Sequence, residues 1–202
     1  MTDNNIEAKH KPKFKATTDS QHKFPIAPNL LEQKFYINEP NRIWTVDMSY
    51  CKTLEGWVYL AVVLDLYSRK IVGWAISDKM NRELIINAFL MAYWARKPKA
   101  GLIHHSDKGS QYASHDFQRI LSKFEVIPSM SGKGNCFDNA VTETFFHTLK
   151  TELMFDHIFE TREEAKSAIF EYIEVFYNRE RKHSTLGYCS PEKFEQYWEK
   201  VA

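Results

Sequence analysis

The stretch that decides the fold covers residues 44–77 and contains WTVDMSY (44–50) and GWVYLAVVLDLYSRKIVGWAIS (56–77). In the first segment apolar and polar residues alternate, which predicts a strand with Asp47 on the face opposite Val46 and Met48. The run over 58–64 is almost continuously apolar, as expected for a central strand covered on both faces. A turn near Ser68 leads to a third strand over 71–76. Three strands joined by short turns predict an antiparallel meander.

Helices and two short strands are predicted after the meander. Apolar residues recur at helical spacing over 82–96, and short apolar runs at 102–104 and 126–128 predict strands, with a helix capped by Ser114 between them. Further helices are expected from Asp138 or Asn139 to about residue 153, after Thr161, and after residue 190. The helix after Thr161 is expected to carry Ala165, Ile169, Ile173 and Phe176 on one side. This order predicts an α/β, ribonuclease H-like fold, in which helices flank a mixed five-stranded sheet made of the meander plus two parallel strands.

The bulk composition indicates one domain with a polar N-terminal segment. The chain has 202 residues, of which 44% are hydrophobic, enough to bury one sizeable core. Residues 1–28 are polar and basic, so we expect a flexible segment there, with a DNA-contacting arm as the alternative. Residues 29–202 are expected to form the core. No apolar run is long enough to span a membrane and the N-terminus has no apolar signal region, which predicts a cytoplasmic protein.

Charge and cysteine usage restrict the function less than the motifs do. The formal net charge is +1, whereas domains that grip a phosphate backbone are usually basic. Charge therefore permits nucleic-acid binding without indicating it. The cysteines at 51, 136 and 189 form no CxxC pair, which suits a reducing compartment and gives no zinc site.

Three carboxylates carry the chemistry. Asp47 lies in the first strand, Asp107 follows a short strand in HHSDKGSQY (104–112), and Glu143 lies on a helix in DNAVTETFFHTLK (138–150), with 35 residues between the last two. Three like charges at one edge of a sheet repel each other, but they suit divalent cations that prefer oxygen ligands, Mg²⁺ or Mn²⁺. Two such ions support phosphoryl transfer. The pattern therefore predicts a nuclease or a strand transferase.

Each carboxylate also has an ordinary interpretation. Asp47 alone resembles a solvated sheet residue, Asp107 a turn aspartate, and Glu143 part of an exposed charged row on a helix. The helix puts Val141, Phe145 and Leu149 on its apolar side. Its opposite ridge carries Glu143 together with Asn139, His147 and Lys150. With both aspartates present, this ridge is expected to combine a metal ligand with DNA contacts.

Several polar residues close in sequence to the three carboxylates have both a functional and an ordinary interpretation. His105 has the same strand parity as Asp107 and is a candidate near the metals, whereas His104 faces the opposite side and is expected to pack or hydrogen-bond. Asp65 ends a strand, and Asp138 is better explained as a helix cap. Both are expected to lie outside the site. The segment SMSGKGNCF (129–137) lacks the P-loop pattern, and its ordinary interpretation is a flexible surface loop.

Six motifs in order resemble the catalytic core of an insertion-sequence transposase of the retroviral-integrase type, the kind encoded by the second of two overlapping frames. They are WTVDMSY, GWVYLAVVLDLYSRKIVGWAIS, HHSDKGSQYAS, SMSGKGNCFDNAVTETFFHTLKTEL, YIEVFYNRERKHSTLGY and SPEKF. The resemblance matches Asp47, Asp107 and Glu143 to the family's metal-binding carboxylates. It matches Lys150 to a basic residue facing the element end, and it suggests that Lys133 and Asn135 lie in a mobile loop against DNA. Thr144 stands where many relatives have serine.

The resemblance implies an enzyme that uses two Mg²⁺ or Mn²⁺ ions to free 3′-hydroxyls at the element ends and to join them to another DNA strand. It also implies a homo-oligomer in the active DNA complex. The family's helix-turn-helix segment, which recognises the ends, is not visible here. We therefore expect either a missing N-terminal segment or a partner chain that supplies recognition. The alternatives are a structure-selective nuclease of the same fold and a non-catalytic DNA-binding derivative.

Overall fold

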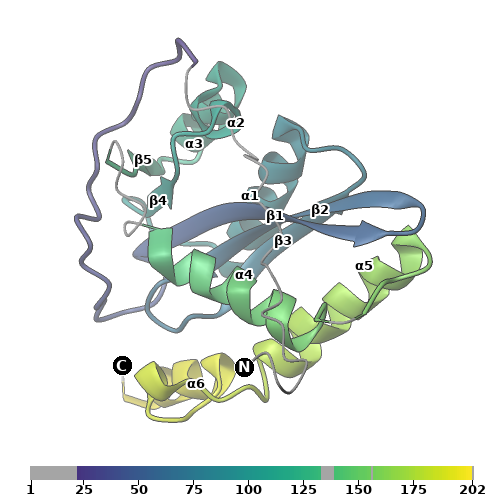
Figure 1. Ribbon diagram of the computed structural model, residues 1–202. Helices are drawn as coiled ribbons and strands as arrows, with labels where there is room; N and C mark the ends of the chain where they lie inside the picture. Colours follow the sequence, from purple (N-terminus) through teal and green to yellow (C-terminus); the bar gives the residue numbers. More distant parts are fainter. Residues whose placement is uncertain (1–21, 133–138, 156, 202) are drawn as a thin grey trace, which may run out of the picture.

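The computed structural model describes residues 22–132, 139–155 and 157–201 (Figure 1). Lys133, Asn135 and Asp138, to which the sequence assigned roles, lie outside these ranges. Within them, no helix combines the length and the apolar character that crossing a bilayer requires.

One five-stranded sheet forms the centre of the molecule, in the order β3-β2-β1-β4-β5. Strands β1 (Ile43–Thr53), β2 (Gly56–Asp65) and β3 (Ile71–Ser77) pair antiparallel, and β4 (Ile103–Ser106) and β5 (Ile127–Met130) add to β1 in parallel. The predicted meander with two parallel strands is confirmed. The two short strands begin and end later than predicted, because His105, Ser106 and Ser129 continue the parallel pairing despite their polar side chains.

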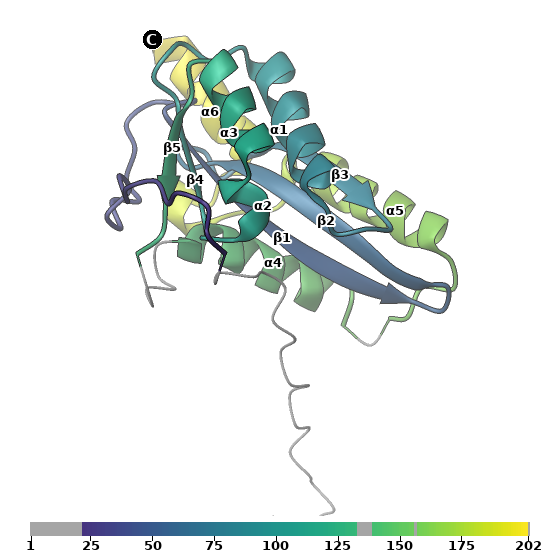
Figure 2. The same cartoon turned by 90° about the horizontal axis from the view of Figure 1, so that it is seen from above.

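Helices cover both faces of the sheet (Figure 2). Helices α1 (Arg82–Arg96), α2 (Ser110–Ala113) and α3 (His115–Lys123) lie on one face; α4 (Ala140–Glu152) and α5 (Arg162–Glu171) lie on the other. The first face buries Trp44, Val46 and Met48 of β1 in its core, as their alternation predicts. The polar face of β1 is therefore turned towards α4.

The N-terminal ends of two helices agree with the prediction from the sequence, whereas one predicted helical face does not. Ser114 and Thr161 accept backbone hydrogen bonds as N-caps of α3 and α5. After Glu171, however, the chain continues as a π-helix, η3 (Tyr172–Tyr177). A wider π turn displaces the buried face by one residue, so Tyr177 is buried and Phe176 is 39% exposed. Phe176 therefore does not share the buried side of Ala165, Ile169 and Ile173, and this part of the prediction was wrong.

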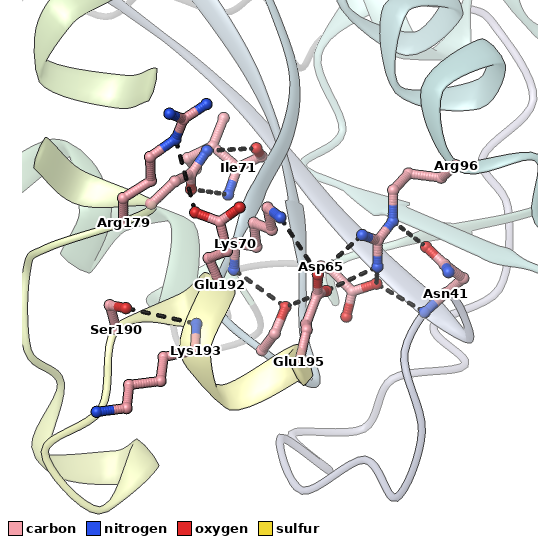
Figure 3. A network of polar contacts seen from close by, with 12 residues as sticks. Asn41, Asp65, Lys70, Ile71, Arg96, Arg179, Ser190, Glu192, Lys193 and Glu195 are labelled. Carbon is pink, nitrogen blue, oxygen red and sulfur yellow. Dashed lines mark hydrogen bonds and ion pairs between the residues drawn. The ribbon is translucent and has the colours of Figure 1, made fainter. Parts of the chain in front are cut away.

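Asp65 belongs to a structural network, as predicted, and not to the candidate site (Figure 3). It is fully buried and accepts hydrogen bonds from the backbone of Asn41 and the indole of Trp44. Beside it, the guanidinium of Arg96 makes a two-pronged contact of 2.7 and 2.8 Å with Glu195 of α6 (Pro191–Val201). This network fastens the C-terminal helix to the turn after β2.

The described part of the predicted N-terminal segment contacts the core. The ring of His22 hydrogen-bonds the carbonyl of Lys108 at 2.8 Å, and the backbone of Met130 donates to the carbonyl of Pro28 at 3.3 Å. Phe24 packs against the first core cluster. The domain boundary at residue 28 stays a prediction.

Candidate active site

Parallel pairing of β1 with β4 sets the two aspartates side by side. Thr45 is the register partner of His105, and continuing this register by two residues sets Asp107 beside Asp47. The Asp47 carboxylate accepts a 2.7 Å hydrogen bond from the backbone of Met48. Asp107 lies just past the end of β4 and accepts a 2.8 Å bond from Gly109, so it is also the turn residue that its sequence suggested.

Helix α4 is fastened across β1 by two polar contacts that sequence reasoning missed. The Thr142 hydroxyl donates to the Thr45 hydroxyl at 2.7 Å, and the Asn139 side chain donates to the Val46 carbonyl at 3.2 Å. Both contacts are buried. They fix the first turn of α4 over the strand that carries Asp47, and Glu143 follows Thr142 directly. The third carboxylate is thereby directed to the same edge of the sheet.

The charges of the three carboxylates affect one another. Burial, and then the negative charge of Asp107, raise the pKa of Asp47 to about 8, with a smaller contribution from Glu143. Burial and Asp107 also raise the pKa of Glu143. Like charges that raise each other's pKa are the electrostatic arrangement that a bound cation would relieve.

The donor set fits a hard divalent cation by its chemistry, because all three side chains offer carboxylate oxygens. In the ranges that the structure describes, though, no three His, Cys, Asp or Glu side chains are close enough together to form a ready-made metal site. The three carboxylates are therefore coupled through their charges without forming a compact cage. Their assignment as metal ligands stays a prediction.

The ridge of α4 that carries Glu143 is only partly as predicted. Glu143 and His147 are exposed and Lys150 is half-buried. The Lys150 ammonium lies 5.3 Å from the centre of the Tyr50 ring, and burial lowers its pKa. Asn139 does not share the exposed ridge, because it is 4% exposed and its amide holds β1. This corrects the expectation that Asn139 shares the ridge of Glu143, while its contact with DNA stays a prediction.

The two histidines before Asp107 differ as their parity predicts. His104 packs edge-on against Phe89 and Phe117 in the core and is 2% exposed. His105 lies on the face of the aspartates, but it is fully buried, and its Nδ1 is 2.9 Å from the Ser129 hydroxyl. It therefore supports the strand ends beneath the site. Whether it also affects bound metal stays a prediction.

Tyr112 is a residue near the site that sequence reasoning did not single out. Its side chain is fully buried, and its hydroxyl has no hydrogen-bond partner among the described residues. Burial, followed by the charges of Asp47 and Asp107, raises its pKa well above the usual value. The only signal in the sequence was its place at the end of the HHSDKGSQY motif. Nothing in the spacing of that motif predicts burial beside the aspartates.

Comparison with known proteins agrees with this geometry. Residues 37–136 and 143–197 match two integrase core domain families. The uncharacterized 31 kDa protein of insertion element IS600 from Shigella sonnei is 48% identical over 197 residues, which cover 98% of this chain and 72% of that protein. The chain belongs to the insertion-sequence transposases with an integrase core. The InsF transposase of insertion sequence IS3A from Escherichia coli K12 is 46% identical, over 94% of this transposase core and 66% of the relative.

Solved structures show the same fold. The transposase core matches a chain of the simian T-cell lymphotropic virus intasome, with a TM-score of 0.65, 16% identity and coverage of 88% of this chain and 60% of that one. The HTLV-2 integrase catalytic core, solved in complex with magnesium in a trimeric form, gives a TM-score of 0.55 at 18% identity, over 77% of this chain and 96% of that one. The ribonuclease H-like fold is confirmed.

Proposed function

We propose that this transposase core cleaves the ends of an insertion element to free 3′-hydroxyls and joins them to another DNA strand, with Asp47, Asp107 and Glu143 as its metal-binding catalytic residues. The observation that carries the proposal is the parallel register of β1 with β4, which leads to Asp47 and Asp107, together with the charges of Asp107 and Glu143, which add to burial in raising the pKa of Asp47. Three separate elements thus bring negative charge to one place. A fold has no structural need for this, whereas a site for divalent cations does.

The residues of the chain have different roles in the proposed reaction. The three carboxylates would hold two Mg²⁺ or Mn²⁺ ions. When bound, these ions stabilise charge on the phosphoryl oxygens and lower the pKa of the attacking hydroxyl. Thr142 and Asn139 keep α4 in place over β1, which sets the position of Glu143. Lys150 and His147, on the exposed side of α4, would hold DNA phosphates, and Lys133 and Asn135 stay candidates for the same role.

Partners and location follow from the same proposal. We expect the active form to be a homo-oligomer on DNA, in line with the trimeric and dimeric forms of the HTLV-2 core. We further expect a helix-turn-helix segment or partner chain to recognise the element ends, and action on DNA in the cytoplasm.

Joining of a pre-cleaved end separates the transferase from a simple nuclease. A duplex with a recessed, free 3′-hydroxyl end and the sequence that borders the gene is incubated with a labelled target in Mg²⁺, Mn²⁺ or Ca²⁺. We expect joined products in Mg²⁺ and Mn²⁺, and binding without chemistry in Ca²⁺, because Ca²⁺ is larger and tolerates looser coordination. Hydrolysis without joined products, even with the partner protein of the upstream frame present, would favour the nuclease. Binding without any chemistry would favour the non-catalytic derivative.

A further inference from the structure

A pocket of about 450 Å³ opens on the flank of α4, beside the ridge of Glu143. Thr144 and Thr148 of α4 form one wall. The other wall comes from two segments. The segment after η3 contributes the basic residues Arg181, Lys182 and His183, and the turn between β2 and β3 contributes Arg69. Four basic side chains and no carboxylate therefore line the pocket in the part of the chain that the structure describes.

Arg69 forms no close ion pair among the described residues, although the charge of Asp65 acts on its guanidinium from beyond ion-pair distance. One of its terminal nitrogens, Nη1, is buried and has no hydrogen-bond partner among the described residues, and Nη2 makes only a 3.4 Å contact with the carbonyl of Phe35. No carboxylate of the described residues forms an ion pair with it. A partly buried guanidinium without a partner is costly. An anion in the pocket would offset that cost.

The other basic residues of the pocket differ in how far they are already satisfied. Arg181 is paired with Glu152 at 2.8 Å, so it offers little free charge. His183 has a buried Nε2 without a partner among the described residues. Burial, and then the nearby arginines, lower its pKa to about 4, so at neutral pH it is an uncharged hydrogen-bonding group. Lys182 is exposed, and none of the ion pairs between described residues includes it. Arg69 and Lys182 therefore supply the positive charge.

The hydroxyl groups favour a ligand with acceptor oxygens. Thr144 and Thr148 donate their hydroxyl hydrogens to carbonyls of their own helix, at 2.7 and 2.9 Å. The hydroxyls of Ser184 and Thr185, on the opposite wall, make no hydrogen bond within the described residues and can donate. Together with Arg69 and Lys182, they form a set of donors around one cavity. A phosphate oxygen is the acceptor that such a set of charged and neutral donors suits best.

We propose that this pocket binds a backbone phosphate of the DNA, on the flank of α4 next to the one that carries Glu143. The proposal rests on the proposed function, since it assigns to the same DNA a second point of attachment. Glu143 and Thr144 are adjacent on α4, about 100° apart around the helix, so the pocket and the carboxylates lie on neighbouring flanks of one helix. A DNA strand bound at both the pocket and the carboxylate site would run across α4. The pocket would then fix which phosphodiester lies at the carboxylates. The segment HSTLGY (183–188), which lines the pocket, would then contribute to DNA binding as well as to the fold.

Binding of DNA without chemistry tests the pocket separately from catalysis. A fluorescent 30-base-pair duplex of arbitrary sequence is titrated in Ca²⁺ at several salt concentrations, with fluorescence anisotropy as the readout. The variants are Lys182→Gln, Arg69→Gln and both together, and the matched control is Lys123→Gln, an exposed lysine on α3. Melting temperatures identify any variant that fails to fold. Lys182 is exposed, and its side chain forms no hydrogen bond or ion pair with the described residues, so Lys182→Gln alone keeps the test valid if Arg69→Gln unfolds.

We expect the double variant to bind about tenfold more weakly, and each lost phosphate contact to lower the slope of log K against log salt by about one. The Lys123→Gln control should bind as the wild type does. If Lys182→Gln and the Lys123→Gln control had the same DNA affinity and the same salt slope, the proposal that the pocket binds a phosphate would be overturned. Absence of DNA binding by the wild type would overturn it too. Joining of pre-cleaved ends by the wild type is measured in parallel. Pocket-dependent binding without joining would therefore refute the proposed function while leaving the phosphate site in place.

Discussion

Buried polar side chains in and near the HHSDKGSQY segment are the clearest departures from ordinary packing. His104 and Tyr112 are both almost completely buried, and each has a polar atom without a partner among the described residues. A buried polar atom without a hydrogen bond typically costs about 1–3 kcal/mol. Such costs make single residues sensitive reporters of the surroundings of the site.

The pH dependence of stability should report on His104. Burial, and then the neighbouring His105, lower its pKa to about 3, whereas the unfolded value is about 6.5. The unfolded chain therefore binds the proton more readily, so stability is full above pH 6.5 and is lost as the pH falls towards 3. The loss is about 1.4 kcal/mol per pH unit. His104→Leu should remove this part of the acid sensitivity, measured by urea unfolding at pH 7 and pH 5. An identical pH dependence in variant and wild type would refute the burial argument.

Removing the hydroxyl of Tyr112 should stabilise the protein. Because this hydroxyl has no partner among the described residues, Tyr112→Phe deletes a desolvated group without breaking a bond. We expect the free energy of unfolding to rise by about 1 kcal/mol, measured by denaturant titration. A loss of stability would show that the hydroxyl has a partner.

At the scale of elements, α1 and α4 are held to the sheet in different ways. Helix α4 uses the hydroxyl and amide contacts to β1, whereas α1 lies so close to β3 that only a glycine fits between them. A Cβ atom on Gly73 would lie 2.4 Å from the carbonyl oxygen of Ala88 and 2.6 Å from the backbone nitrogen of Ala92. Both are backbone atoms of α1, so they cannot rotate away.

Gly73→Ala should therefore destabilise the fold by about 3 kcal/mol or more, since overpacking of a core costs about 1–3 kcal/mol even where side chains can adjust. Gly187→Ala is the comparison, because its Cβ would meet open space and its cost arises only from a φ of +61°, about 1 kcal/mol. Thermal unfolding of both variants gives the ranking. A smaller loss for Gly73→Ala than for Gly187→Ala would contradict the close approach of α1.

The sequence predicted most elements because their signals are local. Alternation in β1, the apolar run of β2 and the caps at Ser114 and Thr161 depend on neighbouring residues. The failures depend on distant ones. The π-helix that displaces Phe176 satisfies packing against the core, and Asn139 turns inward because Val46, far away in sequence, offers a carbonyl. The electrostatic coupling of the three carboxylates agrees with their spacing and motifs, and their role as metal ligands stays a prediction. The burial of Tyr112 could not be predicted, because it depends on how α2 packs.

At the scale of the whole molecule, the C-terminal helix α6 is fastened to the core by buried charges. Glu195 is 5% exposed and contacts Arg96, the Ser68 hydroxyl at 2.8 Å and the Lys70 ammonium at 3.4 Å. These partners belong to α1 and to the turn after β2, which also bears Arg69 of the proposed phosphate pocket. The docking of α6 and the shape of that turn are therefore linked.

Glu195→Gln should cost about 3 kcal/mol of stability, because it leaves Arg96 and Lys70 without their main counter-charge. Glu199→Gln, at an exposed position of the same helix, should be neutral. Amide hydrogen exchange should show faster exchange across α6 in Glu195→Gln alone. Unchanged exchange and stability would mean that α6 is held by its apolar contacts.

Asp47, Asp107 and Glu143 are proposed to form one catalytic site. The most direct test is the single-turnover rate of joining pre-cleaved ends in Mg²⁺ by Asp47→Asn, Asp107→Asn and Glu143→Gln, beside the exposed controls Asp78→Asn and Glu163→Gln. We predict that each of the three variants keeps its fold and loses at least about 1000-fold in rate, because metal-assisted stabilisation supplies several kcal/mol, while both controls join as the wild type does. A joining rate close to wild type in any one of the three would contradict the account.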